Sequence, residues 1–134
     1  FAAACISGDR EKAKGILARI PGIVEKMGLH RRIEMLHRAV EGRRLEGIRL
    51  MAELGFEVSG QTKHDNVGML LETTPLHNAA WMGDLEMVKL LIELGADATI
   101  RDQNYNATPL GWAEYNNKQN VVEYLNSLDV RKNG

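Results

Sequence analysis

The side chains that could do chemistry in this chain are four histidines and a single cysteine. His30 and His64 lie in connections, with no second ligand at the spacing that a zinc or iron site requires, so we predict no metal and no cofactor. Cys5 has no second cysteine with which to form an internal disulfide, and its place among small residues predicts a buried thiol.

The sequence also contains no catalytic motif that would indicate an enzyme. The sequence contains no nucleophile elbow, phosphate-cradling glycine loop or dinucleotide fingerprint. His64 and Asp65 adjoin, but nothing identifies a third member of a catalytic triad. Glu86, Glu93 and Glu123 occupy helix positions that we expect to face water rather than a desolvated cleft. We therefore predict that the chain is not an enzyme.

The sequence contains a motif that is repeated along the chain. The string TPLHNA at residues 74–79 is followed by LGAD at 94–97, and TPL restarts the pattern at 108–110. Alanines at positions 4, 39, 79 and 113 anchor four matching segments. They divide the chain into units at about residues 1–33, 34–73, 74–107 and 108–134.

The T-P-L-H-x-A string and its spacing resemble the ankyrin repeat, in which a turn and two antiparallel helices stack upon the same unit before and after. The third and fourth units carry the most typical pattern. The resemblance implies an all-α fold, an ankyrin-like solenoid of stacked helix-turn-helix repeats with connecting fingers, forming one domain over residues 1–134. It also implies recognition of a partner protein or peptide through the concave helix face and the fingers.

Helix faces and turns agree with stacked hairpins. Apolar residues fall on one face of each second helix, which a single hairpin cannot bury alone; these residues are Val88, Leu91 and Ile92 in unit three and Ile48, Met51 and Ala52 in unit two. Thr74 and Thr108 are expected helix N-caps, each followed by proline. Gly8, Gly83 and Asn117 mark the turn between paired helices. Unit two has Arg43 there, with Gly42 one place earlier, so we predict that its turn is shifted by one residue.

The histidine of the repeated string has a structural role in the resemblance. It implies that the ring of His77 hydrogen-bonds the nearby turn backbone and the threonine hydroxyl. His37 holds the same position, although Glu34 and Met35 replace the threonine and proline before it. Gly111 occupies the position in unit four and abandons the interaction.

Aromatic residues are the strongest functional signal, because most of them lie in the last two units. On the ankyrin pattern several exposed positions of the first helices and one finger position line the concave face. We predict that these residues contact a partner: Asn78, Trp81, Met82, Tyr105, Trp112 and Tyr115. The alternative is that the indoles fill the groove between adjacent first helices, and the sequence leaves both interpretations open.

Charge is distributed unequally along the chain. Residues 1–50 carry +5 and residues 51–134 carry −6, within a net charge of −1. The candidate basic patch, for phosphate groups or an acidic partner segment, consists of Arg31, Arg32, Arg38, Arg43 and Arg44. A solvated helix surface is the alternative. Nucleic acid is the less favoured partner, since no aromatic residues are interleaved with these arginines.

The context of the chain is a further expectation. Phe1 is not an initiating methionine and no TPLH string precedes Ala4, so we expect a fragment of a longer protein. The alternative function is that of a regulatory or targeting domain of a larger enzyme. No apolar run approaches the roughly 18 residues that cross a bilayer, and we expect no membrane association and a soluble, cytoplasmic monomer. The connection at residues 56–73 is longer than the others, and its polar part at 59–68 predicts an exposed loop.

Overall fold

The computed structural model describes residues 1–59 and 73–133, and all regular structure within them is helical. Four helix pairs follow one another: α1 (Ala2–Ser7) with α2 (Arg10–Arg19), α4 (Leu29–Glu41) with α5 (Leu45–Glu53), α6 (Pro75–Met82) with α7 (Leu85–Glu93), and α8 (Pro109–Tyr115) with α9 (Gln119–Asn133). The short α3 (Ile23–Lys26) lies between the first two pairs. The prediction of an exposed loop, with His64 and Asp65, falls largely outside the described residues.

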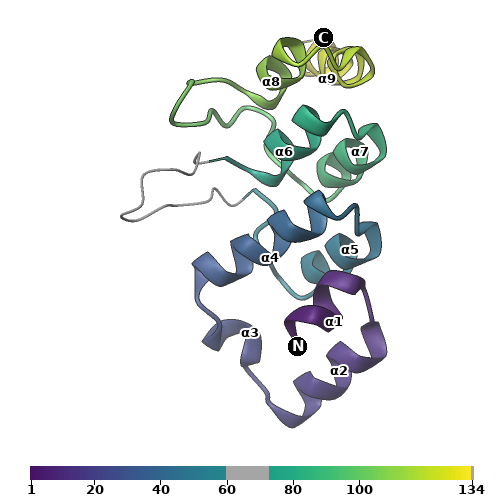
Figure 1. Cartoon of the computed structure of the whole chain (residues 1–134), viewed down its shortest axis with the longest axis vertical. Coiled ribbons are helices and arrows are strands. Elements are labelled where there is room, and N and C mark those ends of the chain that lie inside the picture. Colours follow the sequence, from purple (N-terminus) through teal and green to yellow (C-terminus); the bar gives the residue numbers. More distant parts are fainter. Residues whose placement is uncertain (60–72, 134) are drawn as a thin grey trace.

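The last three pairs form a regular stack. Figure 1 shows α4, α6 and α8 following one another in one column, with α5, α7 and α9 beside them in a second. The helix α6 contacts α4 on one side and α8 on the other, and α7 contacts α9. The connection from α7 to α8 leaves one edge of the stack as a finger (Figure 1). The all-α, ankyrin-like solenoid predicted from the sequence is confirmed.

The first pair packs differently, because α1 lies chiefly against α5 and less against α4. Gly47 in α5 makes this possible. A Cβ atom at Gly47 would lie 1.9 Å from the carbonyl oxygen of Ile6, so no larger residue fits without moving α1. The corresponding residue of the third unit is Met87, which is buried in the core. The close approach of α1 to α5 is therefore specific to this end of the molecule.

The core runs through the stack along the faces that the sequence predicted. Val88 and Leu91 of α7 are buried, as are Ile48 and Met51 of α5. Small residues also lie in the core, and the alanines fully shielded from solvent are Ala13, Ala39, Ala79, Ala80 and Ala113. Because short hairpins bury these faces only against neighbours, the stack is the unit of stability.

The turns between paired helices share one backbone conformation. Gly8, Arg43, Gly83 and Asn117 have φ angles of 82°, 54°, 73° and 58°, all in the left-handed region. The prediction of a shifted turn in unit two is wrong, since Gly42 has φ −88° and Arg43 itself takes the left-handed position. The guanidinium of Arg43 hydrogen-bonds the carboxylate of Asp84 in the next unit, and this contact helps to hold the residue in a conformation that side chains other than glycine rarely adopt.

Candidate binding surface

His77 ties the start of α6 to the finger that follows α7. Its Nδ1 atom accepts a hydrogen bond from the backbone N–H of Thr74 at 3.2 Å, and its Nε2–H donates to the carbonyl of Ala107 at 2.8 Å. The backbone N–H of His77 donates to the Thr74 hydroxyl, completing the N-cap. Burial lowers the pKa of His77, although its bond to Ala107 and the nearby Asp102 act in the opposite direction. The structural role implied for this histidine is confirmed, and the ring is neutral with its proton on Nε2.

Asp102 organises the finger, which we define as residues 99–107. Its side chain is buried and accepts hydrogen bonds from the backbone N–H groups of Tyr105 (2.7 Å) and Ala107 (2.9 Å). It also accepts from the indole Nε1–H of Trp112 at 3.0 Å. Burial by itself raises the pKa of this carboxyl, but these hydrogen bonds and nearby His77 outweigh it and hold the pKa below its usual value. The finger is therefore built around a charged carboxylate.

Sequence reasoning missed Asp102. The signal available was local: an aspartate followed by an asparagine-rich segment, 102–106, is typical of a turn in which the side chain accepts from backbone N–H groups. The structure adds the left-handed Asn106, whose carbonyl accepts from Arg101. This turn presents the ring of Tyr105 at the finger with 72% exposure.

Four aromatic rings lie in contact across α6 and α8. The ring of Trp112 makes T-shaped contacts with those of His77 and Trp81, with centroids 5.1 Å and 5.9 Å apart. The rings of Trp81 and Tyr115 are stacked, with centroids 6.1 Å apart and planes at 19°. Trp112 is 9% exposed and lies beneath the surface, whereas Trp81 and Tyr115 are 41% and 82% exposed. We call Trp81, Tyr115 and the neighbouring Met82, 38% exposed, the aromatic ledge.

Asn78 and Trp112 occupy the same place in successive repeats, and each contacts the preceding repeat. The Nδ2 group of Asn78 donates to Nδ1 of His37 at 2.6 Å. In the next repeat, Trp112 contacts the ring of His77. Asn78 also accepts from the hydroxyl of Thr73. Both residues thus link repeats, and Trp112 also lies against Trp81 of the aromatic ledge.

The five arginines of the candidate basic patch have different surroundings. Arg32 makes a two-pronged contact with Glu57 and donates to the carbonyl of Val24. Arg43 pairs with Asp84. The exposed members are Arg31, Arg38, Arg43 and Arg44. Two members of the predicted patch are thereby engaged in contacts that hold the fold.

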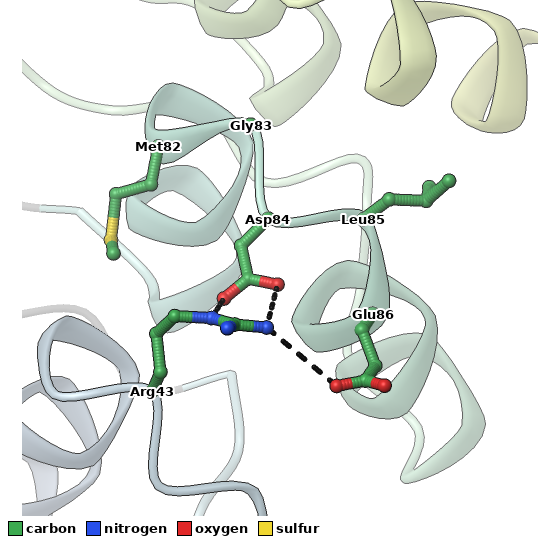
Figure 2. Close-up of a pocket in the computed structure, with 6 residues that line it drawn as sticks. All are labelled: Arg43, Met82, Gly83, Asp84, Leu85 and Glu86. Atoms are coloured by element: carbon green, nitrogen blue, oxygen red, sulfur yellow. Dashed lines mark hydrogen bonds and ion pairs between the residues drawn. The ribbon is translucent and has the colours of Figure 1, made fainter.

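A hollow of about 430 Å³ lies at the turn between α6 and α7. We call it the turn hollow; its lining consists of Arg43, Met82, Gly83, Asp84, Leu85 and Glu86 (Figure 2). The Nε and Nη2 atoms of Arg43 lie 2.6 and 3.2 Å from the two carboxylate oxygens of Asp84, and Glu86 lies 3.6 Å from Nη2. Met82 belongs both to the aromatic ledge and to this lining, so the two features adjoin.

Cys5 is buried, as predicted, and burial raises its pKa to about 11 against the opposing effect of the terminal ammonium group. Within residues 1–59 and 73–133, no group of three or more histidine, cysteine, aspartate or glutamate side chains could hold a metal ion. No helix in this part of the chain is long and apolar enough to cross a membrane.

Comparison with known proteins agrees with this geometry. A family model described as "Ankyrin repeats (3 copies)" matches residues 1–102 and 36–133. The solved ankyrin repeat domain of Bcl-3, a member of the IkappaB protein family, shows the same fold with a TM-score of 0.60 at 24% identity, covering 68% of this chain and 37% of that one. The chain belongs to the ankyrin repeat family. Ankyrin repeats are generally protein–protein interaction modules, which points to a non-enzymatic binding module here.

Two curated relatives share shorter segments. Serine/threonine-protein kinase VIK of Arabidopsis thaliana is 46% identical over 64 residues, which is 46% of this chain and 14% of the relative. Alpha-latrotoxin-Lh1a of Latrodectus hasselti is 44% identical over 52 residues, 39% of this chain and 4% of the toxin. The chain spans only a small part of the length of either protein.

Proposed function

We propose that this chain binds a partner protein or peptide through the aromatic ledge and the finger residue Tyr105. The observation that carries the proposal is the exposure of Trp81, Tyr115 and Tyr105, since large rings left in water favour an interface. Aromatic side chains dominate binding energy because they offer a large contact area at a small entropic cost.

Trp112 fits the interpretation that the indoles fill a groove, whereas Trp81 and Tyr115 fit the interpretation that they contact a partner. Trp112 fills the space between α6 and α8, as the padding interpretation requires, and its indole N–H is already paired with Asp102. Trp81 and Tyr115 stack on one another above it and expose their outer faces. Trp112 therefore supports the aromatic ledge from within, and Trp81 and Tyr115 are the contact residues that we propose.

The test is capture of a partner by the chain and by the double variant Trp81→Ala with Tyr115→Ala. We expect the double variant to lose the captured protein while keeping its helical circular dichroism and cooperative melting. The control carries Glu123→Ala with Asn126→Ala, two exposed positions on α9, and keeps both capture and fold. Undiminished capture by the ledge variant would contradict the proposal. Trp112→Ala is unsuitable here because it removes part of the core.

A second candidate is that this module regulates or targets a larger enzyme. The relative named as a kinase favours it, because the matching segment makes up only 14% of that protein. The test is the complete coding sequence. A catalytic domain in the same open reading frame would support this candidate, and a chain of ankyrin repeats alone would dismiss it.

A further inference from the structure

We infer that the partner segment is basic: a lysine- or arginine-containing stretch whose stems lie on the aromatic ledge and whose cations meet the carboxylates beside it. This inference rests on the proposed function and names the chemistry of the partner at the same surface.

The first argument is the charge of the units that carry the aromatic ledge. Residues 74–128 contain seven carboxylates against three basic side chains, a net charge of −4. One of these carboxylates belongs to Glu114, which is exposed and precedes Tyr115 on α8. A cationic segment is therefore attracted to this half of the molecule, and an acidic segment is repelled.

The second argument is the unequal pairing in the turn hollow. A single guanidinium, that of Arg43, faces two carboxylates. Asp84 holds it through two hydrogen bonds, whereas Glu86 lies 3.6 Å away with a side chain that is 67% exposed. The negatively charged side chain of Glu86 is therefore largely exposed to solvent. Figure 2 shows its carboxylate on the opposite side of the Arg43 guanidinium from the side chain of Met82.

The third argument is that the ring faces of Trp81 and Tyr115 can attract a cation. The faces of Trp and Tyr rings carry negative potential and attract ammonium or guanidinium groups. The methylene stems of lysine and arginine pack on apolar surface while their charged ends stay in water. The stacked Trp81 and Tyr115 provide that apolar surface, and Met82 continues it to the edge of the turn hollow. One basic side chain can lie across the rings while another reaches Glu86.

The experiment uses three dye-labelled, capped nonapeptides that alternate alanine with lysine, glutamine or glutamate, measured by fluorescence polarisation at low salt. We expect the lysine peptide to bind about tenfold more tightly than the glutamate peptide. Glu86→Gln raises the Kd of the lysine peptide about two- to fivefold, as expected of one partly screened charge pair. The matched control Glu123→Gln removes the same charge from an exposed position on α9 and leaves the Kd unchanged.

Several outcomes overturn the inference. These are equal binding of the three peptides, no binding of the lysine peptide at millimolar concentration, or equal effects of Glu86→Gln and Glu123→Gln. If all three peptides bind equally and the Trp81→Ala, Tyr115→Ala variant loses them all, the aromatic ledge stands and only its basic partner falls. If the lysine peptide still binds that variant with unchanged Kd, both the inference and the proposed surface fall.

Discussion

The indole Nε1–H of Trp112 donates to Oδ1 of Asp102 over 3.0 Å, and this bond joins the finger to the first helix of the last repeat. Ala107, whose N–H is held by the same carboxylate, accepts in turn from His77 of the preceding repeat. The finger is thus held on both sides, and Tyr105 and the aromatic ledge share one support.

Asp102→Ala should weaken the fold and loosen the finger. The substitution leaves two backbone N–H groups and the indole N–H without their acceptor, and we expect a loss of about 2–4 kcal/mol in the free energy of unfolding. Urea denaturation measures it. Trp112→Phe keeps a buried ring but removes one of the three donors, so it should cost less. A smaller loss for Asp102→Ala than for Trp112→Phe would contradict the central role of the carboxylate.

The low pKa of Asp102 gives the same contact a pH dependence. A carboxyl whose pKa is lowered by folding stabilises the protein above its unfolded pKa, which is 3.8 here, and that stability is lost as pH falls through the folded value. We expect a loss of stability below about pH 4 that is smaller in Asp102→Asn. Urea midpoints between pH 5 and pH 2.5 provide the measurement, and identical curves for both proteins would refute it.

His77 acts in a higher pH range. Folding lowers its pKa, so the unfolded chain takes up a proton first as pH falls below about 6.5. Stability therefore decreases from that pH downward and levels off below the folded pKa. Protonation on Nδ1 would also remove the acceptor of the Thr74 N–H. The stability of His77→Gln should change less between pH 7 and pH 5 than that of the unchanged chain. Urea midpoints across this range measure the difference. Parallel curves for the two proteins would exclude the effect.

Gly47→Ala tests the packing of the first hairpin. Inside a helix this change ordinarily adds stability, by about 1 kcal/mol. Here the new Cβ would meet the carbonyl oxygen of Ile6 at 1.9 Å, so α1 must move and we expect a loss of about 1–3 kcal/mol. A lower urea midpoint than that of the unchanged chain would support this packing, and a higher midpoint would contradict it. Gly15→Ala is the matched control, because its added Cβ meets nothing within 4 Å.

Cys5 reports on the same hairpin. Its thiol is buried in α1 and has its pKa raised to about 11, so little thiolate is present at pH 8 and a disulfide reagent should label the native protein slowly. Gly47→Ala should accelerate labelling by displacing α1. Equal labelling rates in the two proteins would show that α1 stays in place.

Arg43 offers a test of the turn conformation. Both Arg43→Gly and Arg43→Ala remove the contact with Asp84, but only glycine adopts φ 54° without steric cost. We expect the alanine variant to be less stable than the glycine variant by about 1 kcal/mol in thermal or urea unfolding. Equal stability would mean that the turn rearranges when the guanidinium is absent.

The sequence predicted the features that depend on near neighbours. The Thr74 cap and the buried face of α7 follow from residues a few positions apart, where spacing determines geometry. The bonds of His77 to this threonine were implied by the resemblance to ankyrin repeats. The turn at Arg43 was mispredicted, because glycine preference pointed to Gly42 while a contact 41 residues away, with Asp84, favours its neighbour. Intrinsic propensity is a weak guide where a tertiary contact competes.

The candidate surface was only partly predictable. Repeat register placed Trp81, Trp112 and Tyr115 on one side of the stack, and the structure brings all three together. Register does not distinguish an exposed ring from a covered one, because Trp112 contacts His77 of the preceding repeat and Asp102 of an irregular finger. The packing of α1 on α5 could not be predicted from the sequence either, because its signal is Gly47, at the position where the third unit has Met87.

The two tryptophans both lie in the last two repeats, while the lone thiol lies in the first hairpin. Intrinsic fluorescence therefore senses melting at one end of the stack, and thiol trapping senses it at the other. In a solenoid whose repeats touch only their neighbours, unfolding can spread from the weaker end. With no added label, this chain can show whether it melts as one body or frays in a fixed direction.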